Sequence, residues 1–305
     1  MRLGVLDVGS NTVHLQVVDT SPGARPNPTF NYKEELRLTQ YIDENNLVSD
    51  EGIRNLRECI RRAIAQSDSV KTQELLPFAT SALREASNGE EIISSINKDF
   101  RIDLQVLSGE EEAKLTFLAA RRWFGWSSGR LLVIDIGGGS LEMAVGIDET
   151  PEVATSLPLG AARLTKNFLK GDPYSDKSLR ILRDHIEDKL EQVLPSLVKH
   201  QDTDRAIATS KTLRTIARLS GDWFDGTGKN ITIEAIRKIS TKLSEMKESE
   251  RAKLPGVSEN RASQIVAGAL VAESVMRNLD IKELEICPWA LREGLVLKWL
   301  DWMEA

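Results

Sequence analysis

The segment Arg2-Leu-Gly-Val-Leu-Asp7-Val-Gly9-Ser10-Asn11-Thr12 has a close counterpart in the same chain, Arg130-Leu-Leu-Val-Ile-Asp135-Ile-Gly137-Gly138-Gly139-Ser140. The two segments align without a gap at an offset of 128 positions. In each, an apolar run ends in an aspartate, and glycine with hydroxyl or amide side chains follows before a second apolar run. This pattern predicts a strand, a tight turn and a second strand, with the aspartate and the glycines at the turn.

A second pair of similar segments has nearly the same spacing. Phe78-Ala-Thr80-Ser81-Ala-Leu-Arg84 and Ile207-Ala-Thr209-Ser210-Lys211-Thr-Leu-Arg214 begin 129 positions apart. Two different signals at almost one offset predict a duplicated domain, and the period is far too long for a solenoid. We therefore expect two related lobes that face each other, with both aspartates pointing into a shared cleft.

Length and composition restrict the class of protein. A chain of 305 residues, of which 41% are apolar and 28% charged, is long enough for two domains with separate cores. No apolar run approaches the roughly 20 residues that span a bilayer, and the N-terminus begins in a strand without a cleavable signal. We therefore expect a cytoplasmic protein with no membrane partner.

Charge and cysteine usage exclude further classes. The formal net charge of −6 argues against a protein that binds nucleic acid through bulk basicity, although a local basic groove would still attract a polyanion. Cys59 and Cys287 lie in unrelated settings and are expected to be reduced core thiols. With only three histidines in the chain, zinc sites and histidine-based catalysis have little support.

The periodicity of apolar residues outlines the two lobes. It predicts helices at about 50–66, 108–124, 176–198, 233–246 and 261–277, and strands at 75–79 and 284–287. Residues 157–163 have the composition of a loop, and a strand and turn are expected at 205–211. We place the first lobe at 1–120, completed by a C-terminal helix at 290–305, and the second lobe at 121–289.

The two aspartates and the residues that follow them suit phosphate chemistry. An ionised carboxylate offers only acceptors and repels a phosphate directly, but it can hold Mg²⁺ or orient a water beside one. Backbone N–H groups next to glycine, together with hydroxyl and amide side chains, suit phosphate oxygens. The alternative is that these are simple hairpin turns that need glycine for positive φ. Two copies in register favour phosphate binding, with these candidates: Gly9, Ser10, Asn11, Thr12, Gly137, Gly138, Gly139 and Ser140.

The strand-to-helix turns add further candidates. Thr80 and Ser81 in the first copy, and Ser210 and Lys211 in the second, are predicted to contact substrate, with helix N-capping as the alternative role for the hydroxyls. Arg84 lies one turn into its helix, where it can either reach a phosphate or remain solvated at the surface.

Three glutamates at 110–112 open a predicted helix. Ser108 and Glu111 have capping-box spacing, which gives Glu111 a structural role. Glu112 has no such role, so we predict Glu112 as the general base that accepts a proton from an attacking water, with Glu111 as the alternative. Glu142, in the strand that returns from the second turn, lies on the same side as Ser140 and is predicted to position water or metal.

The two copies are not equivalent in their candidate ligands. The predicted metal ligands are Asp135, Glu142 and Asp7. Asp135 has Glu142 beside it and a fuller glycine loop, whereas Asp7 is followed by Asn11 and His14. We therefore expect the second copy to bind metal and water and the first copy to grip the phosphate.

The motifs together resemble the exopolyphosphatase and guanosine pentaphosphate phosphohydrolase (Ppx/GppA) family, in the family's order and across essentially the whole chain. The segments that carry the resemblance are Asp7-Val-Gly-Ser-Asn-Thr12, Ala79-Thr-Ser-Ala-Leu-Arg84-Glu85-Ala, Ser108-Gly-Glu-Glu-Glu112-Ala, Asp135-Ile-Gly-Gly-Gly-Ser140-Leu-Glu142 and Ala290-Leu-Arg-Glu-Gly294. The resemblance implies an α/β fold of two duplicated ribonuclease H-like lobes, as in actin, sugar kinases and Hsp70. By position, Glu112 looks like the family's catalytic glutamate, and Asp135 and Glu142 look like its metal or water ligands.

The resemblance also implies an activity. It is Mg²⁺-dependent hydrolysis of a terminal phosphoanhydride, with Mn²⁺ as an alternative ion, and it releases orthophosphate from inorganic polyphosphate or removes the γ-phosphate of pppGpp. A homodimer is expected, because the family often pairs in this way. Long family members carry an additional helical region with an HD-type domain, whereas this chain ends soon after Gly294 and resembles the short, two-domain members. A preference for shorter polyphosphates is the expected consequence.

One segment bears on the choice of substrate. Nucleotide-binding relatives have a Gly-rich adenosine turn where this chain has Ala208-Thr-Ser-Lys211-Thr, and Lys211 favours a bare polyphosphate. The alternatives are a pppGpp hydrolase with the same chemistry, an actin-like or sugar-kinase-type ATPase, and a phosphate sensor without turnover.

Overall fold

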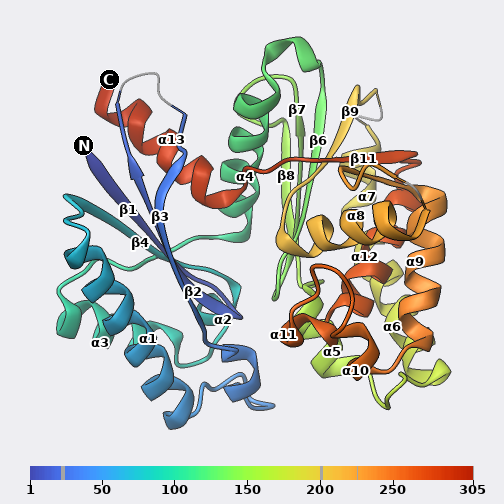
Figure 1. Cartoon of the computed structure of the whole chain (residues 1–305), viewed down its shortest axis with the longest axis horizontal. Coiled ribbons are helices and arrows are strands. Elements are labelled where there is room, and N and C mark those ends of the chain that lie inside the picture. The colour runs from blue at the N-terminus through green and yellow to red at the C-terminus, as the bar shows by residue number, and fades with distance from the viewer. Residues whose placement is uncertain (22–24, 200–201, 225, 305) are drawn as a thin grey trace. The chain divides into compact units, whose positions relative to one another are not determined.

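The computed structural model describes residues 1–21, 25–199, 202–224 and 226–304, and the chain forms two compact units (Figure 1). Unit 1 comprises Met1–Leu115 and Leu291–Ala305, and unit 2 comprises Thr116–Ala290. The sequence analysis placed the boundary near residue 120. In the structure the chain leaves unit 1 inside helix α4 (Gly109–Phe124), between Leu115 and Thr116, because this helix begins in one unit and ends in the other.

Unit 1 contains a five-stranded sheet in the order β3-β2-β1-β4-β5. The first three strands are antiparallel neighbours, and β4 and β5 run parallel to β1. The β1–β2 pair is the hairpin predicted from the first repeat. The strands are β1 (Arg2–Val8), β2 (Thr12–Asp19), β3 (Pro28–Glu35), β4 (Glu74–Ala79) and β5 (Gln105–Val106).

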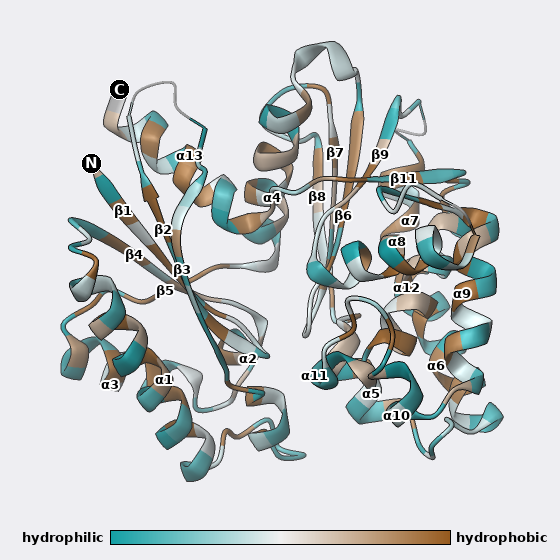
Figure 2. Cartoon of the chain, in the orientation of Figure 1, coloured by the Kyte–Doolittle hydropathy of each residue, from teal (hydrophilic) through white to brown (hydrophobic). Residues whose placement is uncertain are grey.

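Strand β2 shows how alternation builds two cores in unit 1. Val13, Leu15 and Val17 belong to the core that contains α1 (Asp50–Ser69), whereas Val18 belongs to the core that contains α13 (Leu291–Glu304). Successive residues of a strand point to opposite faces, so one strand serves both layers. In Figure 2, α1 carries both hydrophilic and hydrophobic residues, as expected of a helix with one buried face. The remaining helices of unit 1 are η1 (Leu38–Tyr41), α2 (Ser81–Arg84), α3 (Gly89–Phe100) and the start of α4.

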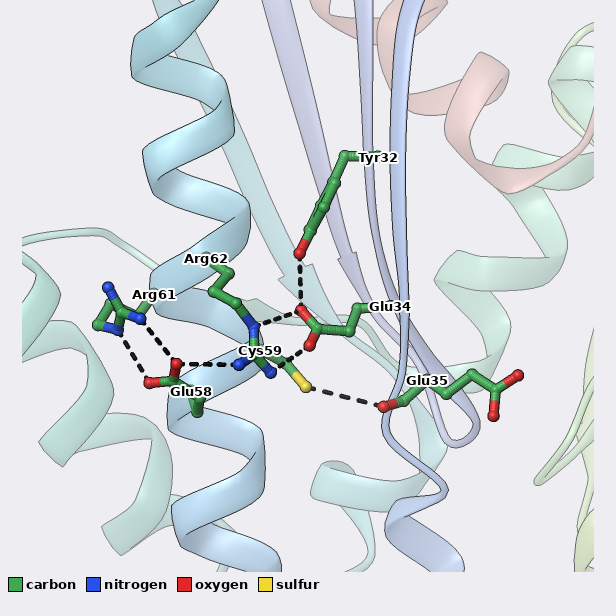
Figure 3. Close-up of polar contacts among 7 residues, drawn as sticks. All are labelled: Tyr32, Glu34, Glu35, Glu58, Cys59, Arg61 and Arg62. Carbon is green, nitrogen blue, oxygen red and sulfur yellow. Dashed lines mark hydrogen bonds and ion pairs between the residues drawn. The ribbon is translucent and has the colours of Figure 1, made fainter.

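A polar cluster joins the edge strand β3 to α1 (Figure 3). The Arg62 guanidinium lies between two carboxylates, with Nε 3.0 Å from Glu34 Oε2 and Nη1 3.0 Å from Glu58 Oε1. Tyr32 Oη donates to the same Glu34 carboxylate at 2.9 Å. Solvent screens exposed pairs of this kind, so the cluster links β3 to the helix without dominating the stability of the unit.

Unit 2 contains a six-stranded sheet in the order β10-β11-β9-β6-β7-β8. Read from its other edge, β8-β7-β6-β9-β11 repeats the order and the directions of β3-β2-β1-β4-β5, so the predicted duplication is confirmed. Strand β10 is an addition that pairs antiparallel with β11. The strands are β6 (Leu131–Ile136), β7 (Leu141–Gly146), β8 (Val153–Leu157), β9 (Arg205–Ala208), β10 (Asn230–Thr232) and β11 (Glu283–Ile286).

Three expectations for unit 2 were wrong. The single helix expected at 176–198 is two helices, α6 (Asp176–Glu191) and α7 (Leu194–Val198), because Pro195 lies in the first turn of α7 and cannot donate a helical hydrogen bond. The helix expected at 261–277 is also two, α11 (Glu259–Ala262) and α12 (Ile265–Asn278). The loop expected at 157–163 is shorter and covers only 158–160, because β8 ends at Leu157 and α5 (Ala161–Phe168) begins directly after it.

The other helices of unit 2 are α8 (Lys211–Phe224), α9 (Ile233–Glu245), α10 (Glu248–Arg251) and the 3-10 turn η2 (Trp126–Ser128). Helix α12 is buried along most of its length, in a core that it shares with α5, α6, α8 and α9. Cys59 and Cys287 are buried and form no disulfide among the described residues, as expected of reduced core thiols. No helix within the described parts of the chain is long and apolar enough to cross a membrane.

Candidate functional site

The two repeated turns are built in the same way. The Gly9 amide donates to Thr12 O at 3.0 Å, and the Gly137 amide donates to Ser140 O at 2.9 Å, so each turn closes between the glycine and the residue three positions later. Neither glycine adopts the left-handed conformation, so the alternative that these glycines serve positive φ is wrong.

Packing does not require these glycines either. A Cβ at Gly9 would lie 3.4 Å from Thr12 O and 3.6 Å from Asp7 Oδ1, and a Cβ at Gly137 would lie 3.4 Å from Ser140 O. These are close to ordinary contact distances. Apart from the chain neighbours of each glycine, no other heavy atom of the described residues lies within 4 Å of either Cβ position, so each turn forms a cradle that a side chain would occupy and that suits the close approach of a ligand.

The first turn contacts the strand-to-helix turn of its own unit. Ser10 Oγ and Ser81 Oγ lie 3.1 Å apart, and both side chains are buried. The Thr80 side chain makes no capping bond to α2, so the capping alternative is wrong for Thr80. The Thr80 amide instead donates to Val8 O at 3.3 Å, which joins the ends of β1 and β4.

Glu112 and Arg84 are brought together in unit 1. The Arg84 Nη1 donates to Glu112 Oε1 and also to Leu107 O, the latter at 2.6 Å. The Glu112 side chain is 8% exposed and that of Arg84 21%, so this is a largely buried ion pair and Arg84 is not a freely solvated surface residue.

Glu111 has the role that its spacing predicts. The Ser108 amide and hydroxyl donate to Glu111 Oε2 at 2.8 and 2.9 Å, and the Glu111 amide donates to Ser108 Oγ at 3.2 Å, which confirms the capping box. These hydrogen bonds from Ser108 lower the pKa of the Glu111 carboxyl. The exposed Glu111 carboxylate is therefore engaged at the helix start, while the buried Glu112 faces Arg84.

Asp7 has an ion-pair partner that the sequence analysis did not predict. Its Oδ2 lies 3.0 Å from Arg292 Nη1, and Arg292 Nε donates to Gln16 Oε1 at 3.2 Å. Gln16 Nε2 in turn donates to Glu293 Oε1 at 2.9 Å. Arg292 and Glu293 belong to the Ala290–Gly294 motif, which carried the family resemblance but no predicted contact.

In unit 2, Asp135 and Glu142 face each other across two strands. They are direct partners in the antiparallel register of β6 and β7, so their side chains share one face of the sheet. Thr209 Oγ1 donates to Asp135 Oδ2, and Ser156 Oγ donates to Glu142 Oε1 at 2.9 Å. The sequence analysis placed Thr209 in the second strand-to-helix turn without predicting its contact with Asp135, and it did not name Ser156, because each contact joins segments that are far apart in the chain.

The first residues of α5 donate hydrogen bonds to carbonyl groups of the second turn. The amides of Ala161 and Ala162 donate to Gly137 O and Gly138 O at 3.0 and 2.9 Å, and Arg163 Nε donates to Gly139 O at 2.7 Å. These bonds occupy the carbonyl oxygens of Gly137, Gly138 and Gly139. An anion at this turn would therefore interact with its N–H groups. A Cβ at Gly160 would collide with the backbone of Gly139 and of the next residue, so this glycine is required by packing.

The strand-to-helix turn of unit 2 differs from that of unit 1. Ser210 has φ 47°, a left-handed conformation rare for serine, and its Oγ accepts from the Leu213 amide at 3.2 Å, so capping is confirmed here. Arg214 Nη1 donates to Pro288 O at 3.0 Å. Burial and the nearby Arg214 charge lower the pKa of Arg261, a residue that no sequence signal had singled out.

The donor set decides where a metal could bind. Within residues 1–21, 25–199, 202–224 and 226–304, no three His, Cys, Asp or Glu side chains gather as a protein metal cage would need. Mg²⁺ commonly binds through one or two carboxylates, with water and substrate phosphates as its other ligands. The facing carboxylates of Asp135 and Glu142 fit that requirement, whereas Asp7 pairs with the Arg292 cation.

Comparisons with known proteins agree with this architecture. The model of the Ppx/GppA phosphatase family matches residues 16–303. Exopolyphosphatase 1 of Mycobacterium tuberculosis (strain ATCC 25618 / H37Rv) is 48% identical over an alignment of 305 residues that covers 99% of this chain and 89% of that protein. The guanosine-5'-triphosphate,3'-diphosphate pyrophosphatase of Vibrio parahaemolyticus is 26% identical over 298 residues, 97% of this chain and 59% of that protein.

A solved structure shares the fold. The crystal structure of an exopolyphosphatase from Cytophaga hutchinsonii superposes with a TM-score of 0.88 at 23% sequence identity, covering 99% of this chain and 98% of that chain. The two-lobe α/β fold that the family resemblance implies is thereby confirmed.

Proposed function

Because this chain belongs to the Ppx/GppA phosphatase family, we propose that it is an exopolyphosphatase, which hydrolyses the terminal phosphoanhydride of inorganic polyphosphate and releases orthophosphate. The observation that carries the proposal is the open cradle at Gly9 and Gly137, which neither backbone strain nor packing explains. The 48% identity to exopolyphosphatase 1 of M. tuberculosis supports the choice of polyphosphate as substrate.

Phosphate binding is assigned to the turns. In unit 1 the Ser10 hydroxyl and the backbone N–H groups after Gly9 bind phosphate oxygens, and in unit 2 the N–H groups of residues 138–140 do so. Their geometry is fixed before substrate arrives, because the amides of Gly9 and Gly137 already donate the hydrogen bonds that close the turns, and amides of α5 donate to carbonyl groups of the second turn. Such pre-organised donors stabilise charge that shifts during phosphoryl transfer.

Glu112 is assigned as the general base. Its carboxylate takes a proton from the attacking water as the oxygen forms its bond to the terminal phosphorus and the bridging P–O bond breaks. The Arg84 guanidinium holds one oxygen of this carboxylate and so fixes its direction. Glu111 cannot take the same position while it caps α4 through Ser108.

A divalent cation is the proposed cofactor. Asp135 and Glu142 would hold Mg²⁺, with Mn²⁺ as the alternative, and the bound ion would neutralise phosphate charge. Thr209 and Ser156 each donate to one of these carboxylates and so fix their orientation.

The assignment of the base is tested with two neighbouring variants. Glu112→Gln is expected to lower kcat for orthophosphate release about 10²–10⁴-fold, the range that a positioned base contributes. Glu111→Gln is the matched control, because the amide can still accept from Ser108, and it is expected to keep kcat within a factor of about three. Near-full activity of Glu112→Gln, with loss in Glu111→Gln, would reverse the assignment.

The choice of substrate is tested by a competition of polyphosphates of graded length against pppGpp, with and without Mg²⁺. We expect orthophosphate release from polyphosphate, fastest from short chains. The relative from V. parahaemolyticus, a guanosine-5'-triphosphate,3'-diphosphate pyrophosphatase, makes pppGpp hydrolysis the second candidate, with the same catalytic residues. A higher kcat/KM for pppGpp than for every polyphosphate would establish that second function.

A further inference from the structure

The Asp7 carboxylate is divided between a cation and the first phosphate turn. Its Oδ2 lies 3.0 Å from Arg292 Nη1. Its Oδ1 lies on the side of Gly9, 3.6 Å from the place where a Cβ of that glycine would be. Both side chains are largely covered, with 19% of Asp7 and 23% of Arg292 exposed. A negative charge thus lies directly beside the turn that is proposed to bind a phosphate anion.

Arg292 is itself fixed by buried groups. Its Nε donates to Gln16 Oε1, and Gln16 Nε2 donates to Glu293 Oε1. Gln16 is 2% exposed and Glu293 7% exposed, so both would be costly to bury without hydrogen bonds. The planar guanidinium can serve the Asp7 carboxylate and the Gln16 amide at the same time, which the ammonium group of lysine does less well.

The positive charge of Arg292 also lowers the pKa of His14, a neighbour of Asp7. His14 is the direct partner of Asp7 in the β1–β2 register, and its pKa is lowered to about 4, mainly by burial and next by the Arg292 charge. The Arg292 guanidinium therefore lies close to the β1–β2 hairpin and is not a solvent-exposed charge at the start of α13.

We propose that Arg292 is a positioning residue of the phosphate site: it neutralises and orients Asp7 so that the Gly9 turn accepts a phosphate group. The inference rests on the proposed function of that turn. It follows that the C-terminal helix α13, which supplies Arg292 from its first turn, is part of the substrate-binding machinery of unit 1. Without the guanidinium, the Asp7 charge would repel the substrate that the turn is built to hold.

The test separates charge from structure by a double-mutant cycle on equilibrium binding of tripolyphosphate, measured by titration calorimetry in the Glu112→Gln background, where turnover is slow. Arg292→Gln is expected to weaken binding at least tenfold. Arg292→Lys keeps the charge and is expected to recover a large part of the affinity. Asp7→Asn combined with Arg292→Gln removes both charges and is expected to bind several-fold more tightly than Arg292→Gln alone.

The matched control is a second arginine–aspartate pair on the same hairpin. Arg2 Nε lies 2.8 Å from Asp19 Oδ1 at the opposite end of β1 and β2, so Arg2→Gln breaks an ion pair of the same chemistry without touching the turn. We expect unchanged tripolyphosphate binding in Arg2→Gln.

The inference is overturned if folded Arg292→Gln binds tripolyphosphate as tightly as the parent, or if the double variant binds no better than Arg292→Gln. If a thermal melt shows that Arg292→Gln does not fold, Arg292→Lys is used instead. A tripolyphosphate affinity within a few-fold of the parent then supports the role of charge. An affinity of Arg292→Lys as low as that of a folded Arg292→Met variant overturns it. The proposed function fails separately, if the unmodified protein releases no orthophosphate from polyphosphate or pppGpp.

Discussion

The two aspartate turns have the same closing backbone hydrogen bond but differ in the charged side chains around the aspartate. Across the strands, Asp7 faces His14, whereas Asp135 faces Glu142. Asp7 is paired with the Arg292 cation, so the first turn has a neutralised carboxylate beside its open cradle. The second turn has two facing carboxylates, each of which accepts a hydrogen bond from a hydroxyl group, and this is the pair that we propose as the ligands of a divalent metal.

The difference accounts for the two roles that we propose for the duplicated turns. The bond that closes each turn is local and is the same in both, 3.0 Å in the first and 2.9 Å in the second. The partner of each aspartate comes from a remote part of the chain: Arg292 is 285 positions from Asp7, and Thr209 is 74 positions from Asp135. Backbone geometry is therefore inherited from the repeat, and chemistry is set by distant side chains.

The largest expected effect comes from removing one charge in each turn. Asp135→Asn is expected to lower kcat about 10²–10³-fold, since a bound metal ion contributes several kcal/mol to the transition state. Asp7→Asn is expected to lower kcat much less and to change mainly KM. Orthophosphate release from tripolyphosphate, measured over a range of Mg²⁺ concentrations, checks both.

The Mg²⁺ titration provides the control for that comparison. The Asp135→Asn variant is expected to need a higher Mg²⁺ concentration for half-maximal rate, while Asp7→Asn keeps the value of the parent protein. Equal losses of kcat and equal shifts of Mg²⁺ requirement in the two variants would mean that the turns are not divided in role.

The glycines provide the next largest effect, and they separate packing from function. Gly160→Ala is expected to destabilise unit 2 by about 1–3 kcal/mol, because its Cβ collides with the backbone of Gly139. Gly9→Ala is expected to melt at or slightly above the temperature of the parent, because the backbone there tolerates a Cβ and alanine restricts the unfolded chain. Its KM for tripolyphosphate is expected to rise about tenfold, because the methyl group occupies the cradle.

Thermal unfolding and steady-state kinetics on the same samples check these glycine variants. Gly137→Ala is the internal replicate, since, apart from its chain neighbours, the single described atom within 4 Å of its Cβ position is Ser140 O, at 3.4 Å. A Gly9→Ala protein that is stable and has an unchanged KM would remove the reason for regarding the open cradle as a binding feature.

Local patterns in the sequence predicted the parts of the fold and site that depend on neighbouring residues. The β1–β2 and β6–β7 hairpins and the Ser108–Glu111 capping box follow from short motifs, and each forms as expected. The breaks between α6 and α7 and between α11 and α12 were missed, although Pro195 is a visible helix breaker. Apolar residues recur at helical spacing across both breaks, and the sequence analysis therefore predicted one continuous helix in each case.

The missed site residues share a physical cause. Arg292, Gln16 and Thr209 act through contacts between segments that are adjacent only in the folded chain. Arg292 and Thr209 lie in motifs that the sequence analysis quoted, but neither these motifs nor the residues around Gln16 indicate which partner each side chain contacts. The position of each aspartate could be predicted because it lies near the end of a strand that leads into a glycine turn. The partner of each aspartate could not be predicted, because it depends on which helix or strand packs against that turn.

A third prediction concerns His14, the residue that Glu142 replaces in the second copy. Burial and the charges of Arg292 and Lys33 lower its pKa from 6.5 to about 4, against a smaller opposing effect of the hydrogen bond with Asn31. Below pH 6.5 the unfolded chain binds a proton that the folded chain resists, so the stability from this residue is complete above pH 6.5 and is lost as the pH falls toward 4. The loss between pH 7 and pH 5 is expected to reach at most about 2 kcal/mol.

Urea denaturation of the parent protein and of His14→Gln at pH 7 and pH 5 measures this contribution. Glutamine keeps a polar partner for Asn31 and cannot take up the proton, so its free energy of unfolding is expected to fall less between the two pH values. An identical fall in both proteins would assign the acid sensitivity to other groups.

The smallest expected effect compares the two strand-to-helix turns, because Ser81 and Ser210 occupy equivalent positions but only Ser210 has positive φ. Ser210→Gly relieves roughly 1 kcal/mol of backbone strain and weakens the cap at Leu213 by a few tenths of a kcal/mol, so a slight rise in stability is expected. Ser81→Gly loses the contact with Ser10 and places glycine in the first turn of α2, at a cost of about 1 kcal/mol. Thermal melts of the two variants should therefore shift in opposite directions. A shift of the same sign would show that the left-handed Ser210 is stabilised by its surroundings, so that the two turns differ in conformation without differing in strain.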